Sequence, residues 1–216
     1  MAIITALTAQ KNNAERVNLY LDGQFAFGLA LSAAHTLRVG QELSSDEITA
    51  LQAQDEVAKA RDVALRLLTY RPRSTTEVRR HLRKKRIDDV VIDQAIEQLT
   101  RANLLNDADF ATYWVEQRET FKPRSHFALR SELQQKGVSR ELIDQALETV
   151  DEPEAARRAA DKQAHRWANL PEDEFRLKLG RYLQRRGFSY DIIKRTTQQV
   201  WQETTAGTDE NASDKW

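Results

Sequence analysis

The spacing of apolar residues has a period of two in the first forty residues of the chain. Residues 17–21 and 25–29 alternate apolar and polar side chains on either side of Asp22-Gly23. The Asp-Gly dipeptide accommodates the two positive backbone angles that a type I′ turn requires. The pattern therefore predicts a β-hairpin, with residues 3–8 as a candidate third strand.

After Gly40 the apolar period becomes helical. Ser44 and Glu47 have the spacing of a capping box, and apolar residues follow from Ile48 onward at helical intervals. A capping box satisfies backbone N–H groups at the start of a helix, so it marks where a helix begins. We expect one or two helices from about residue 45 to Tyr70.

An internal repeat of about 50 residues organises the rest of the chain. Leu82, Leu133 and Leu183 are separated by 51 and 50 residues. A pattern that recurs at a fixed period indicates a repeat architecture. The same two offsets align Ile87, Val138 and Phe188; Ile92, Ile143 and Ile193; Ala95, Ala146 and Thr196; and Leu99, Val150 and Val200.

Caps and breakers divide each copy of the repeat into three helices. In the second copy we expect helices over residues 108–121, 125–137 and 139–150. Serine is a favourable N-cap, while proline and glycine mark helix ends. In the third copy the corresponding positions are Pro153, Pro171, Gly187 and Ser189.

The first copy departs from the other two at one turn. Arg86 stands where the other copies have Gly137 and Gly187. If the turn keeps the left-handed backbone that glycine favours, arginine strains it by about 1 kcal/mol; otherwise the turn is built differently.

These patterns predict a mainly α fold in which three three-helix copies stack into an elongated, curved array behind a small β-hairpin segment. A short helical unit cannot bury its apolar side alone, so tandem copies pack on one another. The tail has no apolar period, and we expect it to be disordered. The predicted divisions are 1–43 (β-hairpin extension), 44–104 (linker helix and first repeat), 105–152 (second repeat), 153–203 (third repeat) and 204–216 (tail).

Composition favours a globular protein, and the absence of cysteine suits a reducing cytoplasm, where we expect the protein to lie. Of its 216 residues 40% are apolar, enough for a core, and none is cysteine, which excludes disulfides, thiolate metal sites and cysteine nucleophiles. The N-terminus has no export signal, and the longest uncharged stretch, residues 23–37, is shorter than the ~20 residues of a membrane span. We expect no membrane partner.

Charge is balanced overall but not along the chain. The segments 1–56, 57–104, 105–152 and 153–203 carry net charges of −4, +6, −4 and +4. The densest run is basic, at residues 79–86, with few carboxylates four positions away. Such a run can be a solvated helix face. Because unpaired like charges on one helix repel, a phosphate backbone or an acidic protein surface is the interpretation we favour.

The sequence contains no set of residues that indicates catalysis or a cofactor. The 7 glycines are scattered singly, so no phosphate-binding loop is present, and the four histidines lack metal-ligand spacing. Asp107 and Asp109 stand at a predicted helix start, where a capping role is favoured over acid–base chemistry. We therefore expect no enzyme, no metal and no cofactor, which disfavours a hydrolase or nuclease.

Aromatic residues recur at helical spacing in the second and third copies. This spacing predicts core positions, with stacking on nucleic-acid bases as the alternative. The residues concerned are Phe110, Tyr113, Trp114, Phe121, Trp167, Tyr182, Phe188, Tyr190 and Trp201.

Three motifs resemble the RecX family of regulatory proteins. They are Arg-Pro-Arg-Ser-Thr-Thr-Glu-Val at residues 71–78, Leu-Asn-Asp-Ala-Asp-Phe-Ala-Thr-Tyr-Trp-Val-Glu-Gln-Arg at 105–118, and Glu-Leu-Gln-Gln-Lys-Gly-Val at 132–138. The middle motif is the most specific. The resemblance covers about residues 57–203, and the hairpin with its Leu-Asp-Gly turn looks like the extension that some members carry.

The resemblance implies a modulator of the RecA recombinase. Members of the family lie in the helical groove of the RecA–DNA filament and typically inhibit strand exchange, ATP hydrolysis and coprotease function, which places them in DNA repair and the SOS response. We expect a monomeric inhibitor that contacts the RecA filament and both single-stranded and double-stranded DNA.

We expect the basic faces of the first and third repeats to make these contacts, and the acidic second repeat to meet basic surface. The alternative is a free-standing DNA-binding module of helix-turn-helix type, because a three-helix unit with a basic second helix also fits that motif. The candidate contact residues are Arg71, Arg73, Arg79, Arg80, Arg83, Lys84, Lys85, Arg86, Arg124, Arg181, Arg185 and Arg186.

Overall fold

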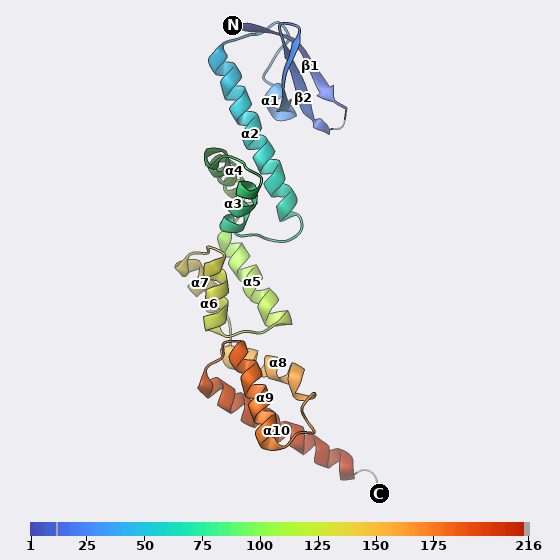
Figure 1. Ribbon diagram of the computed structural model, residues 1–216, viewed down its shortest axis with the longest axis vertical. Coiled ribbons are helices and arrows are strands. Elements are labelled where there is room, and N and C mark those ends of the chain that lie inside the picture. The colour runs from blue at the N-terminus through green and yellow to red at the C-terminus, as the bar shows by residue number, and fades with distance from the viewer. Residues whose placement is uncertain (12, 214–216) are drawn as a thin grey trace. The chain divides into compact units, whose positions relative to one another are not determined.

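The structure is a computed structural model that describes residues 1–11 and 13–213 (Figure 1). The chain divides into two compact units, one ending at Leu105 and the other beginning at Asn106. The first unit contains a sheet, a long helix and a three-helix module that shares this helix. The second unit contains two further three-helix modules. No helix of the described residues is long and apolar enough to cross a membrane.

The N-terminal segment is an antiparallel sheet in the order β3-β2-β1-β4. The predicted hairpin is confirmed: β2 and β3 pair with Leu21 opposite Gln24, and Asp22 and Gly23 between them have φ angles of 49° and 83°. The predicted third strand is β1, which pairs with both β2 and β4. The strands are β1 (Ala2–Gln10), β2 (Asn13–Leu21), β3 (Gln24–Ala30) and β4 (Glu42–Leu43), and the short helix α1 (Leu31–Ala34) follows β3.

One continuous helix, α2 (Ser45–Leu68), follows the sheet. Its predicted capping box is present, with Ser44 and Glu47 each accepting from the other's backbone N–H. Ile48 packs on the sheet, while Ala64 is buried with the next two helices. The buried Asp55 accepts a hydrogen bond from Arg16 of β2 at 2.8 Å, which joins helix and sheet.

The predicted three-helix modules are confirmed. The first module uses the end of α2 with α3 and α4, and each later module has three helices of its own. Their bounds are α3 (Thr75–Lys84), α4 (Asp89–Arg101), α5 (Asp107–Phe121), α6 (His126–Gln135), α7 (Arg140–Leu147), α8 (Glu152–Ala164), α9 (Glu172–Arg185) and α10 (Tyr190–Ser213). The curved stacking of the modules stays a prediction from the repeat pattern.

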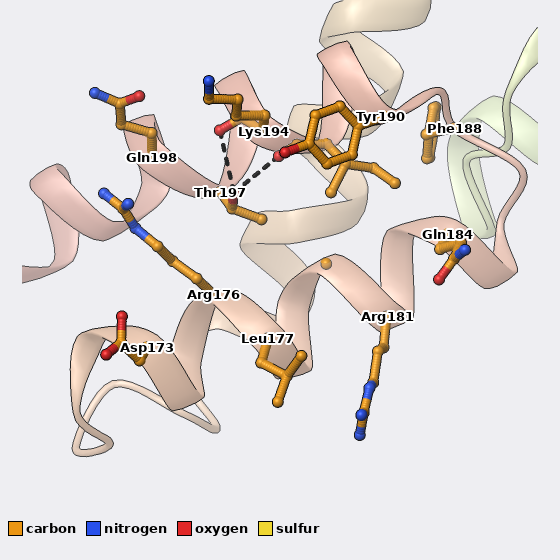
Figure 2. A pocket seen from close by; sticks show the side chains of 12 residues that line it. Asp173, Arg176, Leu177, Arg181, Gln184, Phe188, Tyr190, Lys194, Thr197 and Gln198 are labelled. Atoms are coloured by element: carbon orange, nitrogen blue, oxygen red, sulfur yellow. Dashed lines mark hydrogen bonds between the residues drawn. The ribbon is translucent and has the colours of Figure 1, made fainter.

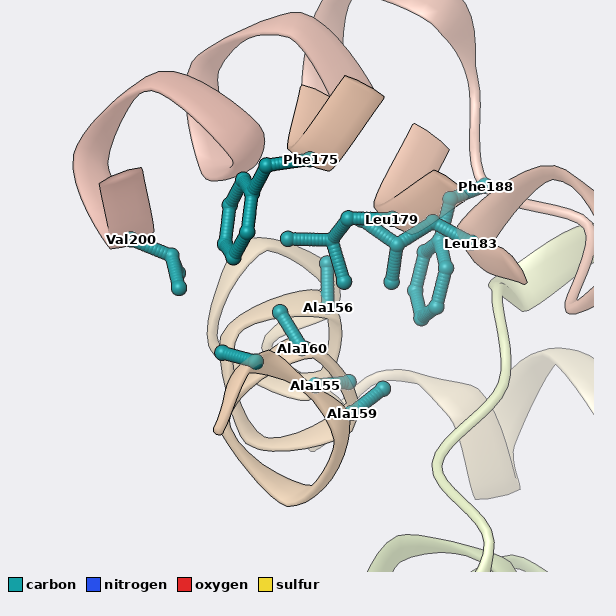
Figure 3. Close-up of a cluster of buried hydrophobic side chains, with 10 residues drawn as sticks. Ala155, Ala156, Ala159, Ala160, Phe175, Leu179, Leu183, Phe188 and Val200 are labelled. Carbon is teal, nitrogen blue, oxygen red and sulfur yellow. The ribbon is translucent and has the colours of Figure 1, made fainter. Parts of the chain in front are cut away.

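Each module has its own apolar core, built from the aligned columns. Leu82, Leu133 and Leu183 are fully buried in the three cores. In the third module α8 contributes five buried alanines, and Phe175 and Leu179 of α9 point toward this helix (Figure 3). Small residues on one helix allow large ones on its neighbour to fill the space between them.

The turn at Arg86 keeps the backbone that glycine adopts in the other copies. Arg86 has a φ of 61°, beside 77° for Gly137 and 91° for Gly187. Of the two alternatives that the sequence leaves open, the strained turn is therefore the one that occurs. The last turn of α3 still closes, because the N–H of Ile87 bonds to the carbonyl of Leu82.

Two of the aromatic core predictions are wrong. Phe121 and Tyr190 are 66% and 76% exposed, whereas Phe110 and Phe188 are buried as predicted. Phe121 is the last residue of α5 and Tyr190 the first of α10. A side chain at a helix end extends beyond the neighbouring helices, so helical spacing alone does not ensure its burial.

The predicted tail also differs from the structure, because α10 continues through residues 204–213. The hydroxyl of Thr204 bonds to the carbonyl of Val200 at 2.7 Å, and that of Thr205 to Trp201 at 3.1 Å. Adding a residue to an existing helix costs far less than nucleating one, so a polar segment continues a stable helix. Residues 214–216 lie outside the described part of the chain.

Candidate functional site

The basic run of the first module lies on α3 and its C-terminal turn. Ser74 caps the helix in a second capping box with Glu77, and Val78 and Leu82 form the buried side. Because only these two positions face the core, most of the cations of the run are exposed to solvent. Four of the cations are exposed, with no ion pair or hydrogen bond of their side chains among the described residues: Arg80, Lys84, Lys85 and Arg86. We call these four the α3 surface.

Three other candidate cations of this module are paired. Arg79 lies 2.5 Å from Asp93, and Arg83 lies 2.7 Å from Asp89, both carboxylates of α4. The hydrogen bond from Arg83 lowers the pKa of Asp89. Arg71 lies 2.9 Å from Glu77 at the start of α3. These ion pairs connect α3 to its surroundings, so the three arginines have structural partners as well as any binding role.

A shallow groove next to the α3 surface is lined by an aromatic ring, that of Tyr70. Val63, Leu67 and Tyr70 line it from α2 and the following turn, and His81 and Lys85 line it from α3, around a volume of about 270 Å³. Tyr70 is 83% exposed. Sequence reasoning did not single out Tyr70, although an aromatic residue just beyond a helix and close to a basic run is the signal that could have found it.

Arg73 and Arg124 occupy matching positions before α3 and α6 and are both partly buried. The Nε atom of Arg124 lies 3.0 Å from Glu132 of α6. The same carboxylate accepts hydrogen bonds from Trp114 and Arg118 of α5, each at 2.7 Å. Glu132 thus accepts from two donors of α5 and forms an ion pair with Arg124, which belongs to this structural network.

The third-module candidates divide into two kinds. Arg181 and Arg185 on α9 are exposed, and no partner of their side chains is found among the described residues. Arg186 is half-buried: it donates to the carbonyl of Pro123 at 3.0 Å and lies 4.7 Å from the ring centre of Tyr182. Arg186 therefore holds the third module against the second within their shared unit.

The candidates belong to both units of the chain. They lie on two units, and the ones free to bind an anion are the α3 surface in the first unit and Arg181 and Arg185 in the second. Within residues 1–11 and 13–213, no group of three or more histidine and carboxylate side chains could hold a metal ion. The unpaired candidates therefore lie on exposed surfaces of the two units.

Comparison with known proteins matches almost every part of the chain to one family. The RecX N-terminal domain matches residues 2–44, and the first, second and third RecX three-helix domains match residues 60–99, 106–147 and 151–196. The regulatory protein RecX of Bacillus licheniformis is 36% identical over 100% of this chain and 84% of its own length. That of Bacillus subtilis is 33% identical over 98% and 82%.

Solved structures agree with the sequence comparison. A crystal structure of regulatory protein RecX aligns with a TM-score of 0.75 at 28% identity, and covers 92% of this chain and 100% of that one. A second, of RecX from Lactobacillus salivarius, aligns with a TM-score of 0.58 at 27% identity over 68% and 97%. With four domain matches in order and relatives above 30% identity along the whole chain, this protein belongs to the RecX family of regulatory proteins.

Proposed function

We propose that this protein inhibits the RecA recombinase by binding the RecA–DNA filament in its groove, and thereby lowers ATP hydrolysis, strand exchange and coprotease activity. Membership of the RecX family supports RecA as the partner. Three modules with separate cores, each with its own charge, suit a protein that contacts several filament subunits.

The single observation that carries the DNA part of the proposal is the α3 surface. Its four cations are exposed, close in sequence and without carboxylate partners in the described structure. Lysine and arginine side chains of this kind gain most from a phosphate backbone, because they release counterions when they bind.

Tyr70 extends this proposal to single-stranded DNA. Its exposed ring lies in a groove bordered by Arg66, His81 and Lys85. An aromatic ring beside cations stacks on unpaired bases while the cations contact the neighbouring phosphates. We expect single strands to bind this surface in preference to duplex DNA without sequence selectivity.

Inhibition follows from occupying two kinds of filament surface at once. The α3 surface and the exposed arginines of α9 would contact phosphates or acidic protein, while the acidic second module meets basic protein surface. A protein bound to two adjacent subunits hinders subunit addition and the closure that accompanies ATP turnover. RecA is inhibited in this way without any catalytic group in the regulator.

Charge reversal on α3 tests the proposal. The variant Arg80→Glu/Lys84→Glu/Lys85→Glu should bind single-stranded oligothymidine more weakly and with a flatter salt dependence. Each single-strand phosphate contact contributes about 0.7 to the slope of log affinity against log salt, so losing three contacts lowers it by about 2. The measurement is fluorescence anisotropy at several salt concentrations.

The matched control reverses three exposed cations elsewhere, Lys11→Glu/Arg38→Glu/Lys122→Glu, with the same change in net charge. This control should keep most of the slope. Equal losses in both variants would mean that net charge alone governs DNA binding and would remove the role assigned to α3. Sequence-specific duplex binding without RecA would favour a helix-turn-helix module instead.

A further inference from the structure

The third module lacks an ion pair that connects the second and third helices of each of the other two modules. In the first module Arg79 of α3 pairs with Asp93 of α4 at 2.5 Å. In the second, Arg130 of α6 pairs with Asp144 of α7. The repeat offsets of 51 and 50 residues place Gly180 of α9 and Lys194 of α10 at these two positions. No pair can form between a glycine and a lysine.

The missing arginine uncovers apolar surface. Ile92 and Ile143, which the repeat aligns with Ile193, are fully buried in the first two modules, but Ile193 is partly exposed. An arginine stem covers apolar surface as well as carrying charge, and glycine has no stem. An open groove of about 650 Å³ results between α9 and α10 (Figure 2).

The floor of this groove is apolar. Leu177, Gly180, Phe188 and Ile193 line it, and Leu177 is 53% exposed. The hydroxyl of Thr197 donates within its own helix to the carbonyls of Ile193 and Lys194, at 2.9 and 3.1 Å. Its hydrogen is therefore already used and is not offered to a ligand in the groove. A large apolar side chain would gain from entering such a space, because the exposed apolar area is removed from water.

The rim of the groove is basic. Arg181 and Lys194 are exposed, with no side-chain partner in the described part of the chain. Arg176 pairs with Glu172 and reaches from α9 toward Gln198 of α10. The single acidic lining residue is Asp173, near the start of α9. Two free cations beside an apolar floor are complementary to a segment that carries both carboxylates and an apolar anchor.

We propose that the α9–α10 groove docks an acidic protein segment that inserts one leucine or phenylalanine side chain between the two helices. A nucleic-acid strand is the alternative occupant, because Phe188 and the exposed Tyr190 also line the groove, but Asp173 would repel a phosphate chain running along α9. The groove is built from residues other than those of the α3 surface, and its existence does not depend on the DNA contacts proposed there.

The probe is a fluorescein-labelled synthetic peptide of about a dozen residues, rich in glutamate and aspartate, with one leucine and one phenylalanine a helical turn apart. Anisotropy with the full chain should show saturable binding in the micromolar range. Replacing the two apolar residues of the peptide by serine, or its carboxylates by amides, should weaken binding at least tenfold. Oligothymidine is measured in parallel.

The decisive variant is Gly180→Arg/Lys194→Asp, which restores the ion pair of the first two modules. Its Cβ at position 180 would lie 3.5 Å from Ile193, an ordinary contact, so the fold should be kept; circular dichroism checks this. We expect at least a tenfold loss of peptide affinity and no change in oligothymidine affinity. Arg195→Ala, with the same change in net charge just outside the groove, should retain both affinities.

Three outcomes would overturn the proposal. These are no saturable peptide binding by the unaltered chain, equal peptide binding by the chain with the restored ion pair, or a loss of oligothymidine rather than peptide on closing the groove. The last outcome would make the groove a nucleic-acid site. A failure of the DNA-binding proposal for α3 can be distinguished from a failure of the groove proposal. The α3 charge-reversal variant should change oligothymidine affinity and leave peptide affinity unchanged.

Discussion

At the residue scale, the turn after α3 has a strained backbone at Arg86, whose side chain belongs to the α3 surface. Arg86 adopts a φ of 61°, a region that costs a residue with a Cβ about 1 kcal/mol. Arg86→Gly should therefore raise the free energy of unfolding by about that amount, as measured by urea denaturation. Gly137→Arg, the reverse change in the second module, should lower it; the same sign in both would contradict the account.

A second prediction concerns the ion pair that joins α8 to α10. Arg157 donates to Glu203 through both terminal nitrogens, which lowers the pKa of Glu203, and its Nε bonds to Asp161 at 2.8 Å. A carboxylate with a lowered pKa stabilises the fold above its ordinary pKa of 4.5, and the contribution is lost as the pH falls through the lowered value.

Glu203→Gln should therefore destabilise the protein at pH 7 by less than about 1 kcal/mol, because the pair is largely exposed. The difference from the unaltered protein should shrink as the pH is lowered below 4.5. Thermal unfolding of both proteins across this range measures it. A difference independent of pH would mean that packing, and not the charge of Glu203, supports the contact.

Single residues also show where sequence reasoning succeeds and fails. The caps at Ser44, Ser74 and Ser125 were predictable, because each bond spans three residues. The pair between Arg79 and Asp93 was not, since fourteen positions separate its members and only the packing of α3 on α4 brings them together. Charges that looked free in sequence were therefore partly paired.

At the element scale, two glycines of the third module should respond in opposite ways to alanine. Gly180 lies inside α9, and a Cβ there would meet only Ile193 at 3.5 Å. Gly187 has a φ of 91°, and a Cβ there would lie 2.5 Å from Ser125 Oγ and 3.0 Å from Ala128. Its turn lies against α6, where the N–H of Ser125 bonds to the carbonyl of Arg186.

We expect Gly180→Ala to raise the unfolding free energy by about 1 kcal/mol, the difference in helix propensity. Gly187→Ala should lower it by at least about 1 to 2 kcal/mol, because the backbone is left-handed and the new atom collides with its neighbours. Calorimetry on both variants measures the two shifts. Destabilisation by Gly180→Ala would show that the α9–α10 groove does not have the space described for it.

The helices and strands were largely predictable, because the pattern of each repeat helix recurs in three aligned copies. The aligned columns, the hairpin turn and the serine caps all lie where local pattern places them. The groove between α9 and α10 was not predicted, since a glycine and a lysine in separate helices carry no local signal. It becomes visible only when the copies are compared position by position.

At the scale of the whole molecule, the balanced net charge conceals two exposed surfaces of different chemistry. The first module presents cations to solvent beside an exposed tyrosine, and the third presents an apolar groove with a basic rim. Family membership follows from all four domain matches together. Sequence alone predicted the family and the module count, whereas which cations are free depended on tertiary ion pairs.

The most direct test of the central claim is the rate of single-strand-dependent ATP hydrolysis by the cognate RecA while this protein is titrated from far below stoichiometric to excess, at two salt concentrations. We expect the rate to fall at substoichiometric ratios, because a filament-bound regulator acts on many subunits, and the α3 charge-reversal variant to require more protein for the same effect. An unchanged rate at every ratio, with DNA binding intact, would contradict the account.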